Sequence, residues 1–146
     1  MGQQPDFSFH KAERLCSRRL IEALFSGGNK SMSAFPLRVL FMPLPAEAGQ
    51  PSVSVLVSVS KRRFKRAVRR NRVKRQIREA YRKNKRILVE ALEAAGGQRL
   101  AVAFLWLSDR LYPSAEVERC VRLLLARVSE QTVPPVALPS DDEQAM

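Results

Sequence analysis

The sequence is poor in the residue types from which protein active sites are usually built. Its 146 residues include one histidine, His10, and the fourteen acidic residues are scattered, except for a group at residues 141–143. Hydrolysis by side chains usually needs a histidine paired with a second titratable group, or clustered carboxylates that hold metal ions. Because the expected folded part offers neither, we expect no catalytic centre and no metal site made by the protein itself.

Cysteine is equally rare. Cys16 and Cys120 lie far apart in the chain, form no CxxC pair and have no metal-ligand spacing with histidine. This pattern excludes the usual zinc sites and gives no indication of a disulfide framework. We predict that both cysteines are small hydrophobic side chains in the core.

Long hydrophobic segments are missing as well. The longest apolar run, at residues 100–107, has eight residues, whereas a membrane-spanning helix needs about 20. Residues 1–15 lack the apolar centre of a secretory signal peptide. We therefore expect a cytoplasmic protein with no membrane partner.

Positive charge is what the sequence has in excess, and one segment carries it. Residues 61–86 contain fifteen of the 26 Lys and Arg residues and a single acid, Glu79, whereas the remaining 120 residues have eleven basic and thirteen acidic groups. The formal net charge of +12 therefore belongs to this segment. Charge of this density repels itself unless a polyanion neutralises it, which indicates a nucleic acid as the partner.

The basic segment also has the periodicity of a helix. At 100° per residue, an apolar stripe falls on one side and a cationic face on the other. The stripe consists of Val73, Ile77, Ala80 and Tyr81, and the cationic face of Asn71, Arg72, Arg75, Arg78 and Arg82. We expect Glu79 to pair with Arg75 or Lys83, each four residues away.

Three kinds of polyanion partner can be compared on this pattern. The apolar stripe is too narrow for a helix that lies on a membrane. The chain that follows, ILVEALEAAGG, is too short for the zipper of a dimeric DNA reader. The backbone of RNA or DNA remains, and the preference for Arg over Lys suits bidentate phosphate contacts and stacking on bases.

Around the basic helix, the hydrophobic pattern predicts one domain of helices and strands. Helical periodicity predicts a helix at residues 11–25, an extension of the basic helix through residue 95, and a last helix at residues 114–130. Alternation predicts strands at residues 36–43, 53–60 and 99–107, with a further short strand near residues 30–35. The stripe that the first helix should bury consists of Ala12, Leu15, Cys16, Leu20 and Ala23.

The predicted strands give the sheet two unequal faces. One is strongly apolar, and the other is a lighter face of serine and alanine together with Arg38. Helices should therefore cover the first face and leave the second more open. We assign residues 1–131 to the domain and residues 132–146, which are proline-rich and then acidic, to a disordered tail.

The basic segment closely resembles a family signature. SVSKRRFKRAVRRNRVKRQIREAYR follows the pattern of the bacterial ribonuclease P protein subunit, and the N-terminal segment is similar to the family pattern too. The matching residues are Val59, Ser60, Lys61, Phe64, Lys65, Ala67, Val68, Arg70, Asn71, Arg72, Lys74, Arg75, Arg78, Glu79, Tyr81 and Arg82, with Arg14, Leu15, Phe25 and Gly28 in the N-terminal segment. The resemblance covers residues 9–128, and Ile21 stands where the family has its first aromatic residue.

This resemblance implies a fold and a role. The fold is an α+β, single-domain α/β sandwich of order α-β-β-β-α-β-α, related to a ribosomal-protein domain. Its mixed four-stranded sheet has a left-handed βαβ crossover, against the usual rule. The role is that of the non-catalytic subunit of an endoribonuclease that removes the 5′ leader from precursor tRNA. The catalytic RNA performs the hydrolysis with magnesium ions, which it mainly binds itself, and DNA is not an expected partner.

Two sets of binding residues follow from the resemblance and the cationic face. The set expected to bind the catalytic RNA is Lys61, Arg62, Lys65, Arg66, Arg69, Arg70, Asn71, Arg72, Lys74, Arg75 and Arg78. The set expected to hold the single-stranded leader, in a cleft between the first helix and the lighter sheet face, is Arg14, Arg18, Ile21, Phe25, Arg38 and Ser58. A cleft that is both apolar and cationic suits unpaired bases of varied sequence.

Two other functions stay open at this point. A ribosomal protein or RNA chaperone, which works outside any enzyme complex, would have the same composition. A DNA-binding regulator is disfavoured because no dimerisation element is visible. If the chain accelerates leader removal by the catalytic RNA at low magnesium, it is a ribonuclease P subunit and neither of these alternatives.

Overall fold

The computed structural model describes residues 13–15, 17–26, 30–45 and 48–132. The expectations for His10, Ala12, Cys16, Gly28 and the tail from residue 133 onward lie outside these residues. The elements, in chain order, are α1 (Arg18–Phe25), β1 (Lys30–Ala34), β2 (Leu37–Leu44), β3 (Val53–Ser58), α2 (Ala67–Asn84), α3 (Arg86–Ala94), β4 (Arg99–Trp106) and α4 (Ser114–Thr132).

The four strands form one mixed sheet in the order β1-β2-β4-β3. β1 pairs antiparallel with β2, and β2 pairs antiparallel with β4. β3 and β4 are parallel neighbours, so the chain between them must cross over the sheet, and α2 and α3 form this crossover. The α+β class and the mixed four-stranded sheet are those expected from the sequence. The connection through α2 and α3 is the βαβ crossover that the resemblance implies to be left-handed.

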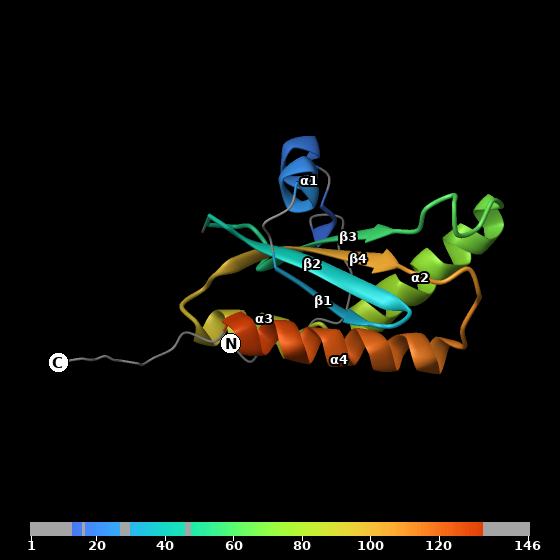
Figure 1. The fold of residues 1–146 in the computed structure, drawn as a ribbon. Helices are drawn as coiled ribbons and strands as arrows, with labels where there is room; N and C mark the ends of the chain where they lie inside the picture. The colour runs from blue at the N-terminus through green and yellow to red at the C-terminus, as the bar shows by residue number, and fades with distance from the viewer. Residues whose placement is uncertain (1–12, 16, 27–29, 46–47, 133–146) are drawn as a thin grey trace.

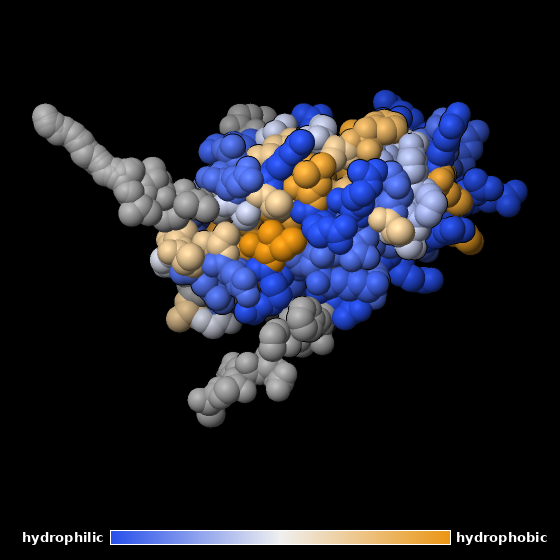
Figure 2. Space-filling view, turned by 90° about the horizontal axis from the view of Figure 1, so that it is seen from below, coloured by the Kyte–Doolittle hydropathy of each residue, from blue (hydrophilic) through white to orange (hydrophobic). Residues whose placement is uncertain are grey.

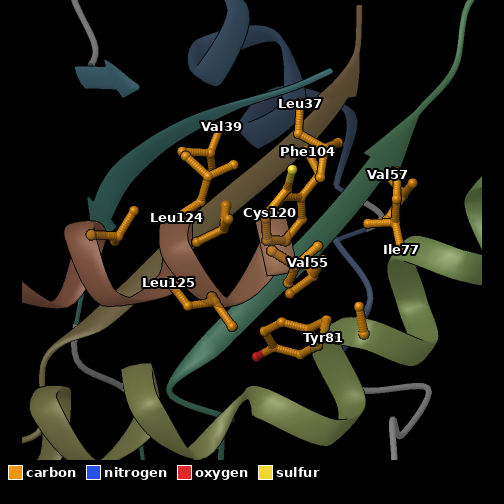
Figure 3. Close-up of a cluster of buried hydrophobic side chains, with 14 of the residues drawn as sticks. Leu37, Val39, Val55, Val57, Ile77, Tyr81, Phe104, Cys120, Leu124 and Leu125 are labelled. Atoms are coloured by element: carbon orange, nitrogen blue, oxygen red, sulfur yellow. The ribbon is translucent and has the colours of Figure 1, made fainter. Parts of the chain in front are cut away.

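Helices cover the two faces of the sheet unequally, as Figure 1 shows. α2, α3 and α4 lie on one face, and α1 lies alone on the other. The face toward the three helices carries the large side chains, among them Val55, Val57 and Phe104, and these form the main core with α2 and α4. In Figure 3, Tyr81 of α2 lies in this core, and its ring centroid is 6.3 Å from that of Phe104.

The lighter sheet face packs against α1 in a smaller core. Leu24 of α1 is buried there with Ala101 and Ala103 of β4. Alanine side chains are small, so α1 can lie close to the strands. The other side chains of this core are Leu15, Leu20, Ile21, Leu40, Met42, Leu44 and Leu56.

The first helix is shorter than the periodicity predicts. It begins at Arg18, and the Ser17 hydroxyl caps it by accepting a hydrogen bond from the Leu20 N–H. Before it, Arg14 forms a parallel bridge with Val55, and the Leu15 N–H donates to the Val55 carbonyl at 2.8 Å. The prediction of a continuous helix from residue 11 is therefore wrong at residues 14 and 15, because the edge of β3 offers backbone partners that helical periodicity does not reveal.

The core stripe of this segment is also partly wrong. Leu15 is buried and Leu20 is half-buried, as expected, but Ala23 is exposed and the neighbouring Leu24 is buried instead. Once the helix begins at Arg18, the phase of its apolar face is set by Leu20, Ile21 and Leu24, which pack on the lighter sheet face.

The basic helix is divided where the sequence predicts one continuous extension. α2 ends at Asn84, whose amide donates to the Ala80 carbonyl at 2.8 Å, and α3 begins at Arg86. Gly96 and Gly97, both with positive φ, then end α3 at the expected place. α4 buries Val117 and Cys120, and Cys120 is a free thiol in the core, as predicted.

A buried ion pair lies at the junction of α2 and α3. The Lys85 Nζ atom is 2.9 and 3.1 Å from the two carboxylate oxygens of Glu13, and both side chains are at most 10% exposed. Glu13 precedes the residues that pair with β3, so this contact joins the N-terminal segment to the helical layer across 72 positions of sequence. Burial of a charge is costly unless it is paired, so each of these two residues depends on the other.

Removing one member of the Glu13–Lys85 ion pair should therefore lower the free energy of unfolding far more than replacing both. Glu13→Ala should lower the free energy of unfolding by about 3–5 kcal/mol because it removes the carboxylate that neutralises the buried Lys85 ammonium. The double variant Glu13→Leu, Lys85→Met replaces the pair by apolar side chains and should lie within about 1 kcal/mol of the natural chain, or above it. Urea denaturation followed by circular dichroism measures both. Equal losses in the single and double variants would contradict this account.

Candidate nucleic-acid interface

The cationic side chains of α2 lie opposite its buried stripe. Val73, Ile77, Ala80 and Tyr81 are at most 3% exposed, as the periodicity predicts. The surface of the helical layer is largely hydrophilic, and hydrophilic side chains project from the end where α2 begins, at the right of Figure 2. Of the residues expected to bind the catalytic RNA, those exposed are Lys61, Arg62, Lys65, Arg66, Arg69, Asn71, Arg72 and Arg75, and those half-buried are Arg70, Lys74 and Arg78.

A groove of about 460 Å³ lies between α2 and the N-terminal segment. We call it the arginine groove, and it is lined by Arg14, Asn71, Arg75, Arg78, Glu79 and Arg82. Burial, and then the neighbouring charge of Arg14, lower the pKa of the Arg78 guanidinium from its ordinary value. Four guanidinium groups and one carboxylate thus share a space the size of a small-ligand pocket.

Glu79 is paired within this groove, but with a different residue from those expected. Arg82 donates to its carboxylate from Nε at 3.0 Å and from Nη2 at 2.6 Å. Hydrogen bonding from Arg82 is the largest cause that holds the pKa of Glu79 below its usual value. The hydrogen-bonded partner is thus Arg82 at three-residue spacing, where the two planar groups meet in a bidentate pair, and the predicted partner Lys83 contributes only its nearby charge, which also lowers the pKa of Glu79.

Arg70 has a structural contact that the sequence did not indicate. One guanidinium nitrogen donates to the carbonyls of Phe64 and Lys65, both at 2.8 Å. These carbonyls belong to the turn that leads into α2. Arg70 therefore ties the first turn of the helix to the chain that precedes it, whatever else it contacts.

A second groove, of about 430 Å³, lies where β3 and β4 end. We call it the serine groove, and it is lined by Ser58, Ser60, Arg62, Arg63, Leu105, Trp106 and Leu107. In the sheet register, Leu105 is the partner of both Arg38 and Ser58, so these three residues form one row across β2, β4 and β3. The structure thus brings Ser58 and Arg38 to one end of the lighter face, and adds Arg62 from the other expected set.

The expected leader residues of α1 lie over the same face. Ile21 is half-buried and packs in the smaller core, whereas Arg18 is exposed and Phe25 is 43% exposed. Arg14 does not join them. Its neighbour Leu15 points into the smaller core and Arg14 lines the arginine groove beside α2, because successive residues of an extended chain point to opposite sides.

Seven groove residues were not assigned to either set from the sequence: Glu79 and Arg82 in the arginine groove, and Ser60, Arg63, Leu105, Trp106 and Leu107 in the serine groove. Arg82 continues the row of Asn71, Arg75 and Arg78 along α2, so helical spacing alone could have added it. Ser60 is two residues after Ser58, so strand alternation could have placed it on the same side. Arg63 lies in the turn and Leu105 on the neighbouring strand, and no local pattern specifies that they line the serine groove.

Metal and membrane sites were searched over the described part of the chain. There, no three or more His, Cys, Asp or Glu residues are grouped so that they could hold a metal ion. No helix in the same residues has the length and apolar character needed to span a bilayer. Both grooves are lined by arginine side chains, four in the arginine groove and two in the serine groove, so the structure is an α+β domain with cationic grooves of a kind suited to a polyanion.

Comparison with known proteins agrees with this class and narrows it. The Ribonuclease P family model matches residues 9–106. A ribonuclease P protein component of Porphyromonas gingivalis strain W83 is 42% identical over 97% of this chain and 100% of that protein. Another, of Chlorobium phaeobacteroides, is 37% identical over 77% of this chain and 81% of that protein.

Solved structures support the fold. The ribonuclease P protein of Thermotoga maritima superposes with a TM-score of 0.60 at 24% identity, covering 79% of this chain and 96% of that one. The Staphylococcus aureus protein gives 0.61 at 17% identity, covering 81% and 96%. The chain therefore belongs to the bacterial ribonuclease P protein family, whose members are protein components of a tRNA-processing endoribonuclease.

The contact made by Arg70 can be tested against its neighbour. Arg70→Ala removes the charged donor from two backbone carbonyls and should lower the free energy of unfolding by about 1–3 kcal/mol. Arg69→Ala removes the same charge from an exposed position and should change it by no more than about 0.5 kcal/mol. Urea denaturation of both variants gives the comparison, and equal effects would show that the Arg70 contacts do not stabilise the turn.

Proposed function

We propose that this chain is the RNA-binding subunit of a ribonuclease P ribonucleoprotein. It binds the catalytic RNA through α2 and the preceding turn, and it holds the 5′ leader of precursor tRNA on the lighter face of the sheet. The RNA subunit carries the chemistry with magnesium ions, as the family resemblance implies. The observation that carries the proposal is the cationic side of α2, opposite a narrow stripe of four buried residues, in a chain that belongs to this family.

The surface of α2 suits a structured RNA. Arginine and lysine side chains that contact phosphates supply affinity with little reading of sequence. A-form RNA is recognised mostly by its shape and backbone, since its deep, narrow groove hides the base edges. A single helix with exposed Arg69, Arg72 and Arg75 presents charges to such a backbone without needing to enter a groove of the RNA.

The lighter sheet face suits an unpaired strand. Phe25 offers an exposed aromatic ring, Arg18 and Arg38 offer exposed guanidinium groups, and Ser58 offers a hydroxyl next to the serine groove. Rings and guanidinium groups stack on any base, so this surface accepts leaders of varied sequence. Ile21 supports α1 from below by packing in the smaller core.

A reconstitution experiment tests the function as a whole. Adding the chain to purified Porphyromonas gingivalis catalytic RNA at low magnesium should accelerate removal of the leader from a precursor tRNA. The chain alone should leave the precursor intact with any divalent ion, since the chemistry is assigned to the RNA. Polylysine of the same total charge serves as the control. If a folded chain accelerates cleavage no more than polylysine does, a ribosomal protein or RNA chaperone becomes the better reading.

Loss of charge from α2 should weaken assembly. Replacing Arg72 and Arg75 by Ala should reduce the affinity for the catalytic RNA and lower the salt dependence of binding by about 0.7–0.9 of a unit of slope for each lost phosphate contact. Filter binding at several salt concentrations measures both. Arg119 and Arg122 of α4, replaced together by Ala, provide a control with the same loss of charge. Equal slopes for the two double variants would contradict the assignment.

Loss of the exposed ring of α1 should affect the leader alone. Phe25→Ala should weaken binding of precursor tRNA to the holoenzyme by about 1–3 kcal/mol, the value of one stacked base, and leave mature tRNA unaffected. Phe35, which is 66% exposed on the turn between β1 and β2, supplies the matched control Phe35→Ala. Equal losses for precursor and mature tRNA, or a loss that only follows the melting temperature, would remove the leader role of Phe25.

A further inference from the structure

The arginine groove is built from two segments that are distant in sequence. Asn71, Arg75, Arg78 and Arg82 follow one another along α2, and Arg14 faces them from the N-terminal segment. Arg14 and Arg78 line the same groove and also interact electrostatically, since the charge of Arg14 contributes to the lowered pKa of Arg78. A site that requires both segments forms only in the folded chain.

Three contacts fix where the Arg14 backbone lies. Glu13, the residue before it, is held by the buried ion pair with Lys85. Leu15, the residue after it, donates its N–H to the Val55 carbonyl and buries its side chain in the smaller core. Arg14 is thus placed between two anchored residues, and its exposed side chain extends over α2 from a fixed origin.

The charges in the groove favour an anion. Four guanidinium groups face one carboxylate, Glu79, so a net positive charge remains when Glu79 is ionised. The bidentate bond from Arg82 to Glu79 fixes the orientation of the Arg82 guanidinium. Guanidinium groups match phosphate oxygens in pairs, and Asn71 adds an amide that can donate to and accept from a sugar or base.

We infer that the arginine groove is a single binding site for the phosphodiester backbone of RNA, and that Arg14 is one of its ligands and not a leader residue of α1. The inference rests on the proposed function and extends it, because it adds Arg14 and Arg82 to the α2 surface. The backbone would lie between Arg14 on one side and Arg75, Arg78 and Arg82 on the other. Both the catalytic RNA and the tRNA carry this chemistry, and the experiment below distinguishes them.

The test uses the full chain and the reconstituted holoenzyme. Arg14→Ala is compared with Arg14→Lys, with Arg75→Ala, with the double variant of Arg14 and Arg75, and with the control Arg122→Ala on α4. Affinity for the catalytic RNA is measured over a range of salt concentrations, and affinity of the holoenzyme is measured for precursor and mature tRNA. Urea denaturation confirms that each variant is folded, which is expected because Arg14 is exposed.

Arg14→Ala should weaken binding of one RNA by about tenfold and lower the salt slope by about 0.7–0.9. Arg14→Lys should recover part of the affinity, because it keeps the charge but not the paired geometry. The double variant should lose less than the product of the two single losses, as expected for ligands of one site. A loss in assembly assigns the phosphates to the catalytic RNA, and a loss for precursor and mature tRNA alike assigns them to the body of the tRNA.

Two results would overturn the inference. If Arg14→Ala behaves like Arg122→Ala while Arg75→Ala weakens binding, Arg14 is not a ligand, although the proposed function stands. If Arg14→Ala weakens only precursor binding and its effect is coupled to that of Phe25→Ala, Arg14 belongs to the leader site instead. If neither Arg14→Ala nor Arg75→Ala has an effect on any RNA, the proposed function itself fails.

Discussion

The narrow apolar stripe of α2 is the constraint on which the rest of the structure depends. Val73, Ile77, Ala80 and Tyr81 attach the helix to the core along one line, so most of its circumference stays outside. A broader stripe would have drawn cationic positions toward the core, where desolvation of unpaired charge is costly. The helix can carry this many arginines because few of its positions are needed for packing.

The two faces of the sheet carry side chains of different size. Its heavy face, with Val55, Val57 and Phe104, fills the space beneath three helices, whereas Ala101 and Ala103 allow a single short helix to lie close on the other side. α1 covers only the rows that contribute to the smaller core, and the row of Arg38, Leu105 and Ser58 lies outside that core. The division into a heavily packed face and a lighter, more open face therefore follows from the alternation of side chains along the strands.

Much of this was predictable because it depends on local periodicity. The stripe of α2, the three longer strands and the last helix follow from spacing alone, and the structure confirms them. The start of α1 was not predictable, because it depends on a bridge from Arg14 to Val55 and an ion pair from Glu13 to Lys85, both between residues distant in the chain. The leader assignment of Arg14 came from the helical reading of its segment, and an extended backbone turns that side chain toward α2 instead.

The turn before α2 connects the two grooves physically. Arg62 in this turn lines the serine groove, and the carbonyls of Phe64 and Lys65 at its end are held by Arg70 in the first turn of the helix. On the other side, Arg14 is anchored to the outer edge of β3, the strand that ends at Ser58. The arginine groove thus contains a residue anchored on the strand that leads to the serine groove, and the turn that carries Arg62 is held at its end by α2, which lines the arginine groove. Under the proposed function, the distance between the RNA on α2 and the leader on the sheet would therefore be set by the fold and not by a flexible linker.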